Sequence, residues 1–128
     1  MPDVPHEKYF ILMGYDPETK EVYGFLINSP KKRPALIQKN LTIRDFQIPI
    51  KRETHAFLQY DSEINCFSYM GIDFSEIVNG LVDSPLKICG NLSAELLQKV
   101  IEATEANRSF SSYEKKILSQ PASFPEFL

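Results

Sequence analysis

Short apolar runs bounded by turn residues occupy the first half of the chain, and this pattern favours β-strands. An apolar run at 8–14 is followed by turn residues at 15–20 and by a second apolar run at 21–28. Two such runs around a short polar turn predict an antiparallel hairpin. Residues 46–50 alternate with period two, but Pro49 cannot donate to a strand ladder, so we expect this strand at a sheet edge or bulge. Further strands are predicted at 56–60 and 64–67.

The second half of the chain changes to helical spacing. Asp73 and Glu76 form a capping-box pattern, which predicts a short helix that Gly80 could end. A second helix is predicted after Ser93, a good N-cap residue. Its apolar residues fall on one face, which should pack on the sheet: Leu96, Leu97, Val100 and Ile101.

A second capping box, Ser111 with Glu114, predicts a last short helix before a tail at 119–128. Pro121 and Pro125 make an extended or mobile tail the expectation. Together these patterns predict a single α+β domain over residues 1–128, with a small antiparallel sheet or barrel followed by C-terminal helices.

Composition limits the class of protein. The chain has 128 residues, of which 43% are hydrophobic and 24% charged, as expected for a globular domain with one core. No apolar run is long enough to cross a bilayer, and the N-terminus lacks the basic start and apolar middle of a secretion signal. We therefore expect a cytoplasmic protein that does not bind membranes.

The residues favour neither a metal nor a cofactor. Cys66 and Cys89 are the only cysteines, and we expect both to be free, buried thiols. His6 and His55 have no Cys or carboxylate partners at metal-ligand spacing. The five glycines are scattered and form no phosphate-binding loop.

Charge is segregated along the chain, although the total is only -3. Residues 31–52 contain seven basic residues against the single acid Asp45, a net charge of +6, and the remainder carries -9. Such a segment could attract phosphates, although charge runs are more often solvated loop residues. Because aromatic and polar residues flank it, we interpret it as an RNA-binding surface with these contacts: Lys31, Lys32, Arg33, Lys51, Arg52, Tyr60 and Asn65.

Candidate chemistry lies in the segment that follows. His55, Asp61 and Ser62 are side chains that can transfer protons or form hydrogen bonds. A ribonuclease needs only a general base, a general acid and cations, because the RNA 2′-hydroxyl is itself the nucleophile. The alternatives remain open: His55 as a structural hydrogen-bonder, and Asp61-Ser62 as ordinary turn residues.

Tyrosine offers a second way to contact RNA. Tyr60 and Tyr69 could stack on bases, as aromatic side chains do in proteins that bind single strands. Buried aromatic residues are also expected in any small barrel, and for Tyr69 the core interpretation is favoured.

The order of elements resembles the PemK/MazF-like toxins of bacterial toxin–antitoxin modules, which are small SH3-like barrels with attached helices. The resemblance spans residues 8–106 and includes an opening strand, a second strand, an edge strand, the segment before the helices and the lead into the long helix: 9–13, 25–29, 46–50, 64–73 and 90–97. It implies an SH3-like β-barrel, a homodimer, an antitoxin partner and metal-independent endoribonuclease action on single-stranded RNA.

The catalytic positions of those toxins are not matched. They carry an arginine before the cysteine position, an acid after it and a second arginine beyond, and this chain has Asn65, Phe67 and Met70 there. If the protein cleaves RNA, other groups must act, and the candidates are His55, Asp61, Ser62 and the cations. The alternative is a non-catalytic protein- or RNA-binding module that kept the barrel and lost catalysis, so the residues leave enzyme activity open.

Overall fold

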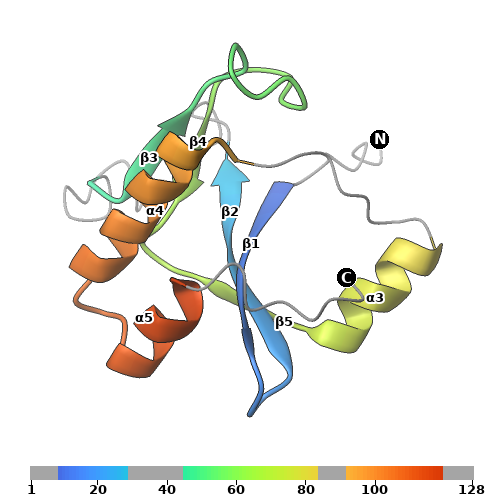
Figure 1. The fold of residues 1–128 in the computed structure, drawn as a ribbon. Helices are drawn as coiled ribbons and strands as arrows, with labels where there is room; N and C mark the ends of the chain where they lie inside the picture. Colours follow the sequence, from blue (N-terminus) through green and yellow to red (C-terminus); the bar gives the residue numbers. More distant parts are fainter. Residues whose placement is uncertain (1–8, 29–44, 84–91, 120–128) are drawn as a thin grey trace, which may run out of the picture.

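The computed structural model describes residues 9–28, 45–83 and 92–119. These residues form an α+β fold with a five-stranded antiparallel sheet and three helices (Figure 1). In chain order the elements are β1 Tyr9–Asp16, β2 Glu21–Asn28, β3 Gln47–Ile50, β4 Ser62–Asn65, β5 Met70–Asp73, α3 Phe74–Asp83, α4 Ala94–Ala106 and α5 Ser112–Leu118.

The predicted hairpin is confirmed as β1 paired with β2. Its register runs from Tyr9 opposite Ile27 to Asp16 opposite Glu21, with an irregularity between Leu12 and Gly14. β1 extends through Asp16, so the connecting turn is shorter than the predicted turn at 15–20. Lys20 closes it with a positive φ of 60°, and its N–H donates to the Asp16 carbonyl (2.8 Å).

Strand β2 is the centre of the sheet. One edge pairs with β1, while the other pairs with β4 at one end and with β5 at the other. β3 pairs with β4, with Pro49 opposite Glu63, and it forms one end of the strand order, which agrees with the predicted edge position. Among the described strands β1 and β3 occupy opposite ends of that order, so the sheet is open.

Two parts of the strand prediction are wrong. Residues 56–60 form no strand, because the backbone from 51 to 58 turns back on itself: the N–H of His55 donates to the Lys51 carbonyl (3.0 Å), and that of Leu58 to the His55 carbonyl (3.1 Å). The predicted strand at 64–67 ends at Asn65 as β4, and a further strand, β5, begins at Met70.

The helix starts are confirmed, and one helix end is not. Ser93 caps α4 by accepting from the N–H of Leu96 (3.3 Å), and Ser111 forms the predicted capping box with Glu114 in α5. Asp73 accepts from the N–H of Ser75 (2.8 Å) at the start of α3. That helix continues past Gly80 to Asp83, so the predicted stop is wrong. Within the described residues, no helix is both long and apolar enough to cross a membrane.

The core lies between one face of the sheet and helices α4 and α5, which lie to one side of the hairpin while α3 lies to the other (Figure 1). Leu96 and Val100 are buried in this core, and Leu97 and Ile101 pack against it, as the helical spacing predicts. α5 approaches β1 so closely that a Cβ on Gly14 would stand 1.8 Å from the Ile117 carbonyl oxygen.

Candidate functional site

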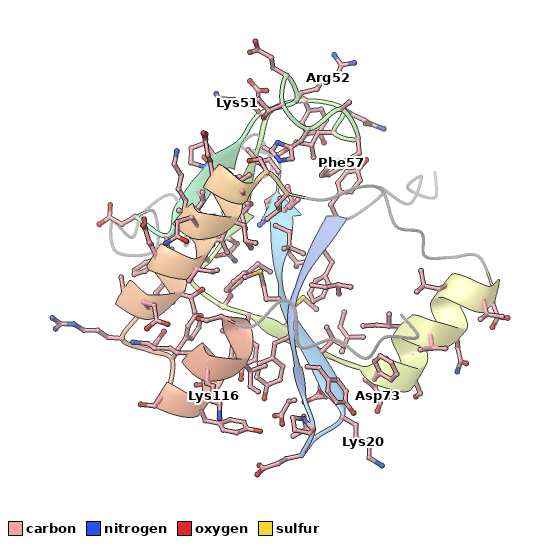
Figure 2. All side chains as sticks on the ribbon, viewed as in Figure 1. Lys20, Lys51, Arg52, Phe57, Asp73 and Lys116 are labelled. Carbon is pink, nitrogen blue, oxygen red and sulfur yellow. The ribbon has the colours of Figure 1, made fainter. Side chains whose placement is uncertain are left out.

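Most of the described candidate residues lie on the loop between β3 and β4, residues 51–61, hereafter the 51–61 loop. Figure 2 shows Lys51, Arg52 and Phe57 at one end of the molecule, opposite the end that carries Lys20 and Lys116. The remaining candidates on the basic segment, Lys31, Lys32 and Arg33, fall outside the described residues, as do Cys89, His6 and all but the first residue of the tail at 119–128.

His55 is buried, with 5% of its surface exposed, and hydrogen-bonded at both ring nitrogens. Its Nε2 lies 3.2 Å from the backbone nitrogen of Ser93, the N-cap residue of α4, and its Nδ1 lies 2.9 Å from the Thr54 hydroxyl. Because Nε2 must accept from a backbone N–H, the ring proton belongs on Nδ1, which donates to Thr54. Among the open alternatives, this geometry corresponds to the structural hydrogen-bonder.

Asp61 closes the 51–61 loop at the surface. Its Oδ1 accepts from the N–H of Arg52 (2.9 Å), and its Oδ2 lies 3.7 Å from the Lys51 ammonium. Both charged side chains are mostly exposed, so their ion pair adds little stability. The backbone bond to Arg52 is the contact that fixes the loop ends together.

Ser62 begins β4 and is buried, and its hydroxyl donates to the Tyr60 carbonyl (3.0 Å). His55 is hydrogen-bonded to Ser93 and Thr54, Asp61 to Arg52, and Ser62 to Tyr60. None of these hydrogen bonds joins one of the three candidate side chains to another. The structure brings the three residues to one loop and its edge without linking them as a proton relay.

The exposed face of the 51–61 loop carries cations and an aromatic ring. Lys51 is 62% exposed at its side chain, and Tyr60 is 50% exposed. Arg52 donates through Nε to the Leu58 carbonyl (3.2 Å), which holds the side chain along the loop. An open hollow of about 460 Å³ lies beside it, lined by Arg52, Glu53, Ala56 and Asp61. Two basic residues, Lys51 and Arg52, are matched in this loop by two acids, Glu53 and Asp61, so the loop has no net charge. The basic excess of residues 31–52 therefore lies mainly outside the loop.

Asn65 lies on β4, away from the loop surface. Its side-chain oxygen accepts from the Gln47 amide (3.0 Å) and from the N–H of Phe67 (3.1 Å). The first bond crosses from β4 to its partner β3, and the second holds the chain where β4 ends. Both contacts are made within the protein and support the strand pairing. Contact between Asn65 and RNA stays a prediction.

A second polar cluster, which the sequence patterns do not predict, joins the hairpin to α5. Asp16 is buried, and its carboxylate accepts hydrogen bonds from Tyr23 (2.8 Å), Tyr113 (2.5 Å) and the N–H of Glu18 (2.9 Å). Burial opposes ionisation most strongly, but the bonds from the two tyrosines and Glu18 together outweigh it, so the pKa of Asp16 lies below its ordinary value.

The tyrosines of this cluster are held protonated. The Asp16 carboxylate raises the pKa of Tyr113 to about 12, and burial followed by the bond to Asp16 raises the pKa of Tyr23. Tyr69 stacks on Tyr23 and donates to Glu114, and burial together with this bond raises its pKa to about 12. These phenols act as hydrogen-bond donors to carboxylates.

Tyr69 packs against the core, as favoured from the sequence. Its partner Glu114 is recognisable in the sequence only as a capping residue, because its backbone bond to Ser111 is local, whereas Tyr69 lies 45 residues away. The packing of α5 against the β1–β2 hairpin, which completes the cluster, has no local sequence signal.

Metal and thiol chemistry receive no support within the described residues. No group of three or more His, Cys, Asp or Glu side chains in this part of the chain could hold a metal ion. Cys66 is a buried free cysteine, and burial raises the pKa of its thiol to about 12, which keeps it in the protonated, unreactive form.

Comparison with family models, curated proteins and solved structures finds no match to this chain.

Proposed function

We propose that this chain is a toxin-like protein of a toxin–antitoxin or mobile-element module that binds single-stranded RNA on the exposed face of the 51–61 loop without cleaving it. The observation that carries the proposal is a division of roles on this loop. His55 uses both ring nitrogens within the fold, whereas Lys51, Arg52 and Tyr60 reach solvent.

The exposed groups are of the kind that single-stranded nucleic acid binds. Lysine and arginine attract backbone phosphates, and a tyrosine ring offers a face on which a base can stack without regard to sequence. Lys51 and Arg52 adjoin each other in the chain, and Tyr60 precedes Asp61, which bonds to the N–H of Arg52. The three side chains therefore come from adjoining ends of one closed loop.

The contacts favour binding over cleavage. A general base must reach the 2′-hydroxyl with a free acceptor, and the unprotonated nitrogen of His55 is already accepting from Ser93 in the protein interior. Ser62 is buried and donates to a backbone carbonyl. The chain also lacks the catalytic residues of the PemK/MazF-like toxins that it resembles, because Asn65, Phe67 and Met70 stand at those positions.

A metal-independent endoribonuclease is the second candidate, favoured by one observation. The carboxylate of Asp61 is mostly exposed and lies beside Lys51, so an acid and a cation adjoin each other at the proposed RNA surface. In that case Asp61 would act with Lys51 and Arg52, while His55 would stay in the interior. The RNA experiment given at the end of this section distinguishes the two candidates, because it records both RNA binding and the length of the RNA.

The resemblance also supports proposals on fold and partners. We propose that the sheet corresponds to the SH3-like barrel of these toxins, and that the protein is a cytoplasmic homodimer with an antitoxin protein as partner. The supporting observations are the antiparallel hairpin, the edge strand β3 and the helices after β5, in the order of the resemblance. Light scattering after size exclusion tests the dimer.

The function is tested with a fluorescent single-stranded RNA of mixed sequence in EDTA, by anisotropy at about 50 and 200 mM salt and by gel analysis of RNA length. The Lys51→Glu variant should weaken binding and reduce its salt dependence. The matched control is Lys116→Glu, an exposed charge reversal at the opposite end of the molecule (Figure 2), which should bind like the wild type. Equal losses in both variants would contradict the proposed surface, and shortened RNA would support the endoribonuclease instead.

A further inference from the structure

We propose that His55 is a positioning residue that orders the 51–61 loop from the N-terminus of α4, so that Lys51 and Arg52 are held in place for RNA. This inference rests on the proposed function, which it extends by assigning His55 a role other than proton transfer. It stands on a continuous set of hydrogen bonds between helix and loop.

The hydrogen bonds run from α4 through His55 to the backbone of Lys51. The N–H of Ser93 donates to His55 Nε2 (3.2 Å), His55 Nδ1 donates to the Thr54 hydroxyl (2.9 Å), and that hydroxyl donates to the Lys51 carbonyl (3.2 Å). All three hydrogen bonds in this series donate in the same direction, from α4 towards Lys51. In this arrangement neighbouring hydrogen bonds strengthen one another.

The Lys51 carbonyl is the point on which the loop converges. It also accepts from the N–H groups of Thr54 (3.2 Å) and His55 (3.0 Å). The next residue, Arg52, has its own N–H bound to Asp61 and its side chain bound to the Leu58 carbonyl. The backbone that carries both cations is therefore fixed before any ligand arrives, which reduces the ordering entropy that binding must overcome.

A second anchor holds the other half of the loop. The Tyr9 hydroxyl of β1 donates to the Phe57 carbonyl (2.9 Å), and the centroids of the two rings are 5.3 Å apart. The rings of Phe57 and His55 meet edge to face, with their centroids 6.0 Å apart. The anchor from Tyr9 does not involve Lys51, so removal of the imidazole should free the 51–55 backbone while the rest of the loop stays attached.

The test compares His55→Ala with His55→Gln, whose side-chain oxygen can accept from Ser93. Thr104→Val serves as control, because it removes a fully buried hydroxyl whose only described bond is to the Val100 carbonyl within α4, away from the loop. Two quantities are measured: hydrogen exchange at the backbone amides of positions 54, 55 and 58, and the Kd for single-stranded oligouridylate.

We expect His55→Ala to speed exchange at these amides and to weaken binding about tenfold, as loss of a pre-ordered loop implies. His55→Gln should restore most of both quantities, and Thr104→Val should leave the Kd unchanged. Unchanged exchange and Kd in folded His55→Ala, no recovery in His55→Gln, or an equal loss in Thr104→Val would overturn the inference. If the wild type binds no RNA, the proposed function fails, and the exchange data still decide whether His55 orders the loop.

Discussion

The carboxylate of Asp16, the last residue of β1, accepts a hydrogen bond of 2.5 Å from the hydroxyl of Tyr113 in α5, 97 residues later in the chain. Its other oxygen accepts from Tyr23 of β2. Because Asp16 is 1% exposed, its charge depends on such donors rather than on water. This contact joins the first hairpin to the last helix.

Removal of one donor should destabilise the protein. In Tyr23→Phe the ring stays in its stack with Tyr69, but the hydroxyl that donates to Asp16 is lost. A hydrogen bond to a buried charged group contributes about 1–3 kcal/mol, so the free energy of unfolding in urea should fall by that amount. The matched control is Tyr15→Phe, whose ring contacts Phe74 and whose hydroxyl has no described partner. Equal effects of the two substitutions would contradict this role.

The same carboxylates predict loss of stability in acid. Hydrogen bonds keep the pKa of Glu114 below its ordinary value, through the Ser111 backbone first and Tyr69 next, and the pKa of Asp16 is also lowered. In the unfolded chain both groups bind protons at a higher pH. Their contribution to the free energy of unfolding is therefore complete above their ordinary pKa values, at about pH 4. It is lost as the pH falls through the lower pKa values of the folded protein.

Urea midpoints measured from neutral pH down to about pH 2.5 test this dependence. Asp16→Asn should be less stable than the wild type at neutral pH and should lose less stability on acidification, so the two curves approach each other. Asp83→Asn, a change of the same charge at an exposed site, controls for net charge and should follow the wild type. Parallel curves for Asp16→Asn and the wild type would show that this carboxylate is not the origin of the effect.

Elements with local determinants could be predicted from the sequence. The β1–β2 hairpin and the caps at Ser93 and Ser111 depend on residues only a few positions apart, and the structure confirms them. The predicted strand at 56–60 is wrong although Leu58 is buried, because Leu58 reaches the core from a loop whose backbone turns. An apolar residue indicates burial, and a buried turn places it in the core as well as a strand does.

Asn107 at the end of α4 should be sensitive to substitution. Its amide donates to the carbonyls of Cys66 (3.1 Å) and Phe67 (3.0 Å), and its oxygen accepts from Ser109. Asn107→Ala leaves two carbonyls between β4 and β5 without this donor, and buried unpaired groups of this kind cost about 2–4 kcal/mol together. The loss is measured by thermal or urea unfolding. The exposed Asn79→Ala in α3 should change stability by far less.

Gly14 in β1 and Gly71 in β5 should respond differently to alanine. At Gly14 a Cβ would overlap the Ile117 carbonyl of α5, which is backbone and cannot rotate away. We expect Gly14→Ala to cost at least about 1–3 kcal/mol, because overpacked sites force the backbone apart. At Gly71 the nearest atoms, at 3.1 Å, belong to the movable Glu21 carboxylate. Equal stability of Gly14→Ala and Gly71→Ala would contradict the tight seat of α5 on β1.

The candidate site was visible in the sequence only as a set of residue types. His55, Asp61 and Ser62 lie together in the chain, but their roles depend on partners elsewhere: Ser93, 38 residues from His55, decides which imidazole nitrogen accepts. The Asp16 cluster needs residues from β1, β2 and α5 and has no signal in local spacing. Long-range hydrogen bonds of this kind become predictable only when the sheet order and helix positions are known.

Amide NMR spectra of the protein, recorded while single-stranded RNA is added in EDTA, show directly whether the 51–61 loop binds RNA. If the 51–61 loop binds RNA, shifts should concentrate at Lys51, Arg52 and Tyr60, increase to saturation and weaken with salt, while the RNA stays intact. Shifts confined to other elements, or no shifts at millimolar RNA, would contradict RNA binding by this loop.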